Sequence, residues 1–121
     1  MQVAHLDDFE PFVTKDGSSI RELAGLVSLP ARHQSLAEAT VPPRSETEEH
    51  LHRTTEELYF FTAGGGRLRL GGEEREVRAG DCAVIPPATP HKLINPGDEP
   101  LVLLCCCSPP YTHADTELTG R

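Results

Sequence analysis

Proline and glycine interrupt this chain so often that the sequence offers no long helix. The 121 residues include 11 prolines and 10 glycines, which separate short apolar runs, and no long stretch keeps its apolar residues at helical spacing. Short strands that alternate with turns at intervals of about 8–12 residues are typical of a β-sandwich or a closed β-barrel. We therefore predict an all-β fold.

Eight segments have the composition of strands, several with the period of two that β-structure requires. They are residues 20–29, 34–41, 58–63, 67–70, 73–78, 82–85, 91–95 and 101–107. We expect the strands at 82–85 and 101–107 to be buried. We interpret the three glycines at 64–66 as a hairpin turn and not as a phosphate-binding loop, because the Lys-Ser/Thr of such a loop is missing. Residues 1–19 and the tail from Ser108 show no clear period, and we expect them to wrap the barrel or reach a neighbouring subunit.

Length and charge limit the class of protein. A chain of 121 residues is long enough for one domain, 1–121, but too short for two. Its formal net charge of −8 would repel a phosphate backbone, so we expect no nucleic-acid partner. The first 12 residues lack the basic and apolar regions of a signal peptide, and no apolar run reaches membrane-spanning length, so we expect no membrane partner. Three of the four cysteines are consecutive, which excludes a secreted disulfide framework and favours the cytoplasm.

Histidines and a glutamate have the spacing of metal ligands. His50 and His52 lie two residues apart and would share one face of a strand. In an unbroken strand Glu56, an even number of residues from His52, would share its face and be the next ligand. A bend in the polar stretch 53–56 would change which side chains face inward and would favour Glu57, which we prefer. His91 follows a proline-rich turn that would fix its approach. Three imidazoles and one carboxylate suit Fe, Mn, Ni, Cu or Zn and are too rich in nitrogen for Ca or Mg.

Two motifs give the chain a specific resemblance to the cupin superfamily. The first, G-x5-H-x-H-x3-4-E-x6-G over about 44–64, is matched by His50, His52, Glu57 and Gly64, and this spacing selects Glu57 over Glu56. The second, G-x5-P-x-G-x2-H-x3-N over about 80–95, is matched by Gly80, Pro86, His91 and Asn95. Arg44 and Ala88 stand where the motifs have glycine, which leaves the geometry of those two turns open.

The resemblance implies a single-domain jelly-roll β-barrel that holds one divalent transition metal ion through His50, His52, Glu57 and His91. It also implies a homodimer, which would protect edge strands. Two functions follow. One is a metal-dependent protein that acts on a small oxygen-bearing molecule, such as a sugar, a sugar phosphate or an organic acid, by isomerase, lyase, decarboxylase or dioxygenase chemistry. The alternative is a non-catalytic module that binds a metal and a small ligand. Convergent polar groups around the metal would favour the first function over the second.

Other side chains have weaker claims to the site. Tyr59 and Phe61 would share the inward face with Glu57, and an adjoining strand brings Arg32 and Gln34 within reach of a substrate. Within the motif region only Tyr59 and Glu56 remain as acids or bases beyond the ligands. We interpret residues 105–107 as small side chains that pack a strand without binding metal, with Cys106 pointing away from its two neighbours, and His5, His33 and His113 as unrelated to function.

Overall fold

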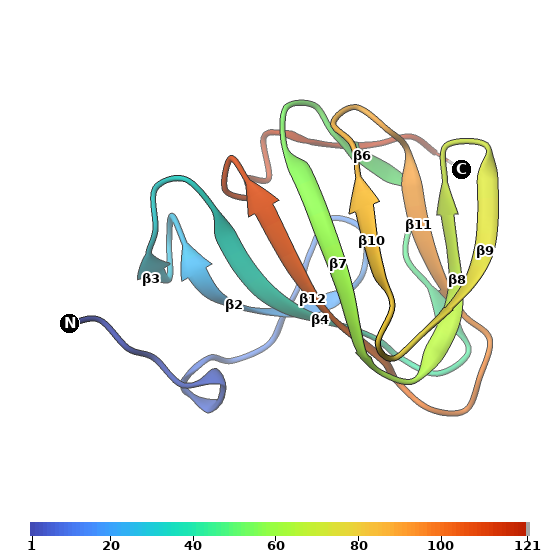
Figure 1. The fold of residues 1–121 in the computed structure, drawn as a ribbon, viewed down its shortest axis with the longest axis horizontal. Helices are drawn as coiled ribbons and strands as arrows, with labels where there is room; N and C mark the ends of the chain where they lie inside the picture. Colours follow the sequence, from blue (N-terminus) through green and yellow to red (C-terminus); the bar gives the residue numbers. More distant parts are fainter. Residues whose placement is uncertain (121) are drawn as a thin grey trace.

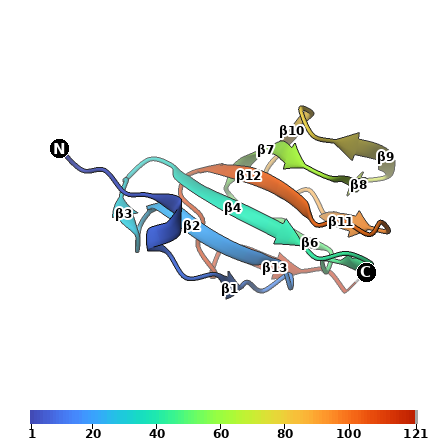
Figure 2. The same ribbon diagram turned by 90° about the horizontal axis from the view of Figure 1, so that it is seen from below.

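Two facing β-sheets make up the molecule (Figure 1, Figure 2). A computed structural model describes residues 1–120. The first sheet runs, in spatial order, through β1 (Phe12–Val13), β2 (Ser19–Gly25), β4 (Ser35–Val41), β12 (Leu101–Ser108), β7 (Glu56–Ala63) and β10 (Cys82–Ile85), and β3 (Leu29–Pro30) pairs with β2. The second sheet runs through β13 (Thr116–Leu118), β6 (His50–His52), β11 (His91–Asn95), β8 (Gly65–Leu70) and β9 (Glu73–Arg78), and β5 (Ser45–Glu46) pairs with β11. The all-β prediction is confirmed; a single 3₁₀ turn, η1 (Leu6–Asp8), is the helical part of residues 1–120.

One hydrophobic core lies between the sheets. Strand β7 shows how the sequence builds it, because Glu57, Tyr59 and Phe61 are buried while the residues between them are exposed. Facing residues from the second sheet include Leu68 and Leu93, so both sheets contribute to the same cluster. A single core of this kind is what one domain requires.

The strand predictions were wrong at four places. Strand β2 ends at Gly25, where the Ala31 N–H bonds back to the Gly25 carbonyl and closes a turn, so 20–29 is not one strand. In β10 only Ile85 is buried, and in β12 only Leu101, Leu103 and Cys107 are, because each strand has one outward face. The hairpin turns at Gly64, with φ +77°, whereas Gly65 and Gly66 already belong to β8.

Both motif turns that lack their glycine keep the backbone conformation that glycine favours. Arg44 has φ +53° and Ala88 has φ +59°, the left-handed region that side chains with a Cβ adopt at a cost. The question that the sequence left open is thereby answered: the turns keep a left-handed geometry despite the substitutions.

Both terminal segments contribute strands, which the absence of a clear period did not predict. Residues Phe12–Val13 pair with β2, and Thr116–Leu118 pair with β6 next to the histidines. Figure 2 shows β1 and β13 at the lower edge of the molecule. Among residues 1–120, no helix has the length and apolar character that a membrane crossing needs.

Candidate metal centre

Three short elements bring the predicted ligands together at one end of the barrel. His50 and His52 lie on β6, and His91 on β11 faces His50 directly in the antiparallel register. Glu57 comes from β7 in the other sheet. The predicted bend is confirmed, because β6 ends at His52 and β7 begins at Glu56, so Glu57 points inward and Glu56 is exposed.

Hydrogen bonds fix the tautomers of two of the rings. The Nδ1 atom of His50 lies 2.9 Å from the Glu48 carbonyl oxygen, and the Nδ1 atom of His91 lies 2.9 Å from the Thr89 carbonyl oxygen. A carbonyl oxygen only accepts, so each Nδ1 must carry the hydrogen. In the neutral ring, Nε2 therefore keeps a free lone pair, which is the form that binds a metal.

His52 reaches the same state through a side chain on the C-terminal strand. Its Nδ1 atom lies 3.0 Å from Thr116 Oγ1, whose own hydrogen is donated to the Thr112 carbonyl oxygen at 3.0 Å. The threonine oxygen must therefore accept from Nδ1–H. All three histidines are thus set to present Nε2 lone pairs.

These atoms converge on one point. One ring nitrogen from each of His50, His52 and His91 lies within 4.8 Å of the other two. Glu57 Oε1 lies 3.2 Å from His52 Nε2 and 3.6 Å from His91 Nε2. Within residues 1–120, Glu57 Oε1 and His91 Nε2 are buried and have no hydrogen-bond partner. Such groups cost roughly 1–3 kcal/mol each, more when charged, unless a ligand satisfies them, so the site fits a bound metal ion.

The electrostatics favour the protonation states that a metal needs. Burial raises the pKa of the Glu57 carboxyl, but hydrogen bonds and positive charge from His52 and His91, when their Nε2 atoms carry a proton, outweigh this and lower the pKa to about 2. Burial is also the main cause that lowers the pKa of His50, and the neighbouring His91 adds to it. A carboxylate and a neutral imidazole are the ligating forms of these groups.

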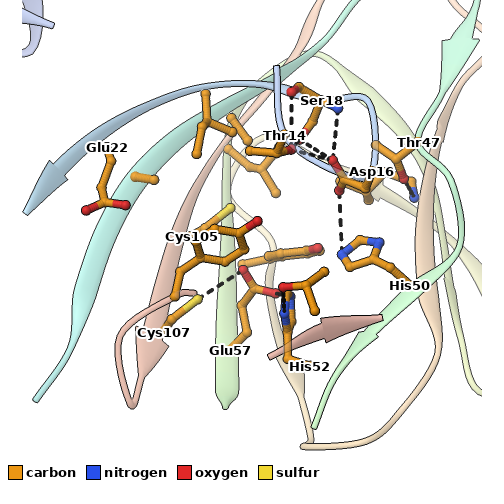
Figure 3. Close-up of a pocket in the computed structure, with 18 of the residues that line it drawn as sticks. Thr14, Asp16, Ser18, Glu22, Thr47, His50, His52, Glu57, Cys105 and Cys107 are labelled. Atoms are coloured by element: carbon orange, nitrogen blue, oxygen red, sulfur yellow. Dashed lines mark hydrogen bonds and ion pairs between the residues drawn. The ribbon is translucent and has the colours of Figure 1, made fainter. Parts of the chain in front are cut away.

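An interior cavity opens onto His50 and His52, and its wall is partly polar (Figure 3). Apolar residues such as Ile20 and Leu103 form part of the lining. Tyr59 also lines the cavity, whereas Phe61 lies in the hydrophobic core and does not. The polar part includes Thr14, Asp16, Ser18, Glu22, Thr47 and Tyr111.

Other sequence expectations fall outside the cavity. Arg32 and Gln34 are exposed in the loop before β4 and do not line it, so their predicted place beside a substrate is wrong. His5, His33 and His113 are exposed and lie apart from the three ligand histidines, as predicted.

Comparison with known proteins identifies the family. Residues 37–107 match the family described as Cupin domain. The chain belongs to the cupin family. An uncharacterised protein of Methanocaldococcus jannaschii is 50% identical to this cupin over 112 residues, which cover 93% of this chain and 90% of the relative.

Two solved structures show the fold of this cupin in other contexts. An oxalate decarboxylase of Lactobacillus farciminis, in complex with formate, superposes with a TM-score of 0.81 at 25% identity, over 95% of this chain and 35% of that one. The polyketide cyclase RemF from Streptomyces resistomycificus has a TM-score of 0.78 at 23% identity, over 89% of this chain and 79% of that one. The first is similar to this cupin over about a third of its own length, and the second supports the fold alone.

Sequence reasoning missed two residues that face the centre of this cupin. Asp16 Oδ2 lies 3.5 Å from His50 Nε2, and the Tyr111 ring lies 5.8 Å from the His52 ring. Both come from outside the two motifs. The Asp16-Gly17 pair signals a turn, but nothing local indicates that this turn packs against His50, because that contact depends on sheet pairing.

The predicted alternation of the cysteine side chains along β12 is confirmed, but the prediction that they only pack the strand is wrong. Cys105 and Cys107 line the cavity, whereas Cys106 does not. Cys107 Sγ donates to Glu57 Oε2 at 3.3 Å, so this thiol orients the carboxylate and is more than packing. Burial, followed by the charge of Glu57, raises the pKa of Cys105 and Cys107 well above the usual range, so both remain thiols.

Proposed function

We propose that this cupin is a metal-dependent protein that binds and acts on a small oxygen-bearing molecule. In this proposal one divalent transition metal ion, chosen from Fe, Mn, Zn, Ni and Cu, is bound by His50, His52, His91 and Glu57. The observation that carries the proposal is the cluster of three histidines with fixed tautomers, two of which, His52 and His91, face the buried, unpartnered Glu57 Oε1.

The chain's own residues would determine what happens at such a centre. An ion with four protein ligands keeps up to two open positions and supplies Lewis-acid chemistry to an oxygen atom bound there. Polar groups beyond the ligands, among them Asp16 and Tyr111, lie on the cavity wall and can orient that molecule. Their presence favours a protein that acts on its ligand over the alternative, a non-catalytic module.

Metal analysis of tag-free protein tests the proposal. We expect close to one transition metal ion per chain and loss of the ion in His50→Ala and in His91→Ala. His113→Ala is the matched control, because the His113 side chain is exposed and does not belong to the cluster. A double variant, His50→Ala with His91→Ala, that still holds a full equivalent of metal would contradict the ligand assignment. Substrate screens with the identified metal then separate turnover from binding alone.

We also propose that the chain forms a homodimer through the outer face of β7, β10 and β12. Leu58, Phe60 and Val84 are 40%, 44% and 53% exposed there, and Val84 lies opposite Leu58 in the register. Contiguous exposed apolar side chains of this kind mark association sites. Light scattering should give a dimer mass for the wild type and a monomer mass for Phe60→Glu, while Val27→Glu, exposed elsewhere, stays dimeric. A monomeric wild type would contradict the proposal.

A reducing, cytoplasmic location is a further part of the proposal. The four cysteines are free thiols in the structure, and none is committed to a disulfide. Alkylation of the protein in freshly broken cells, followed by mass spectrometry, should find all four reduced.

A further inference from the structure

Asp16 presents one carboxylate oxygen to the centre and holds the other in place. It lies in the turn between β1 and β2, where Oδ1 accepts hydrogen bonds from Thr14 Oγ1 at 2.7 Å, Ser18 N at 2.9 Å and Ser18 Oγ at 2.7 Å (Figure 3). The Glu48 N–H also donates to the Asp16 carbonyl oxygen at 2.7 Å, which ties this turn to the segment just before β6. Oδ2 receives none of these bonds and points toward His50 Nε2 at 3.5 Å.

The cavity is lined by three carboxylates and, apart from the histidines, by no basic side chain within residues 1–120. Asp16, Glu22 and Glu57 line it, and within residues 1–120 no lysine or arginine does. Lys15 is the basic residue nearest to Asp16 in sequence, but its side chain points to the C-terminal segment, where Nζ donates to the Thr116 carbonyl oxygen at 2.8 Å. The three carboxylates carry one formal negative charge more than the two positive charges of a divalent ion. An anionic ligand would find no cationic side chain to compensate its charge.

The size of the cavity narrows the ligand further. It offers about 50 Å³ to the centres of water-sized molecules. One water needs roughly 10–15 Å³ on that measure, so the space suits a ligand with a few non-hydrogen atoms. Asp16 Oδ2 is a polar atom of this lining that lies beside the His50 ring, and as a carboxylate oxygen it accepts hydrogen bonds.

We infer that this cavity takes a small neutral molecule with oxygens on adjacent carbons, one of which donates a hydroxyl hydrogen bond to Asp16 Oδ2, and that it rejects carboxylate and phosphate anions. The inference rests on the proposed function and narrows its substrate class. Asp16 acts as a specificity-determining residue and not as a metal ligand. The preference differs from that indicated by the name of the similar oxalate decarboxylase, because oxalate is a carboxylate.

Glycolamide and glycolate test the inference, because they have the same shape and differ in charge. Calorimetric titration of metal-loaded wild type should show tighter binding of glycolamide than of glycolate. Asp16→Asn keeps a side-chain oxygen for the turn and removes the charge. In this variant we expect glycolamide to bind about tenfold more weakly and glycolate about tenfold more tightly, with metal content unchanged, since hydrogen bonds to charged groups contribute about that much.

Asp98→Asn is the matched control, because it removes the same charge from an exposed position that pairs with Arg44, and both affinities should stay at the wild-type values. Tighter binding of glycolate by the wild type would overturn the inference, and this measurement does not depend on the folding of a variant. Loss of metal in Asp16→Asn would also overturn it, by making Asp16 a ligand. Wild type that takes up no metal would instead overturn the proposed function together with this inference.

Discussion

Glu56 and Glu57 are neighbours in sequence, yet they lie on opposite faces of β7, and this difference tests the ligand assignment. Glu57→Gln removes a buried anionic oxygen beside His52, so we expect the metal affinity to fall at least tenfold. Glu56→Gln changes an exposed side chain and should leave the affinity nearly unchanged. Competition with a chelating dye measures both. Equal losses in the two variants would show that the motif register is wrong.

Ala88 is the residue at which local geometry and local sequence disagree. Its φ of +59° is strained for alanine and unstrained for glycine. Ala88→Gly should therefore raise the free energy of unfolding by about 0.5–1 kcal/mol, after the greater freedom of glycine in the unfolded chain is subtracted. Ala83→Gly, in the middle of β10, should lower it by about 1 kcal/mol. Denaturant unfolding measures both, and a destabilised Ala88→Gly would show that the methyl group contributes more than the strain costs.

At the scale of elements, strand β13 supports the centre through a hydrogen bond that the motifs do not contain. Thr116 Oγ1 accepts from His52 Nδ1–H, which holds the ring in its ligating tautomer. Thr116→Val keeps the shape and removes the acceptor, so we expect a loss of metal affinity of about 10–100-fold. Thr116→Ser should restore most of the affinity. Loss in both variants, with unchanged far-ultraviolet circular dichroism, would indicate packing and not the hydrogen bond.

The same strand shows where prediction from sequence ends. The spacing of His50, His52 and Glu57 could be interpreted correctly because ligands and bend lie within eight residues of one another. Asp16 and Thr116 reach the site through pairing between strands that are far apart in the chain, and their local sequence carries no period. Burial was overestimated for β10 and β12 for a related reason: apolar runs do not reveal which of their two faces another layer covers.

At the scale of the whole molecule, the centre joins the two sheets. The three histidines belong to the sheet that contains β6 and β11, and Glu57 belongs to the sheet that contains β7. A bound ion would therefore link the two layers of the barrel through coordination bonds that the unfolded chain cannot form as a set.

Metal should accordingly raise the thermal stability of the entire domain. Free metal at about 1,000 times its dissociation constant adds on the order of 4 kcal/mol to the free energy of unfolding. For a chain of 121 residues we expect the Tm to rise by on the order of 10 °C or more. Scanning calorimetry of chelator-treated and metal-loaded protein measures the rise. Glu57→Gln should lose a large part of it, because the link to the first sheet is weakened, whereas Glu56→Gln should keep it. A Tm that does not change with metal would mean that the ion, if bound, does not join the sheets.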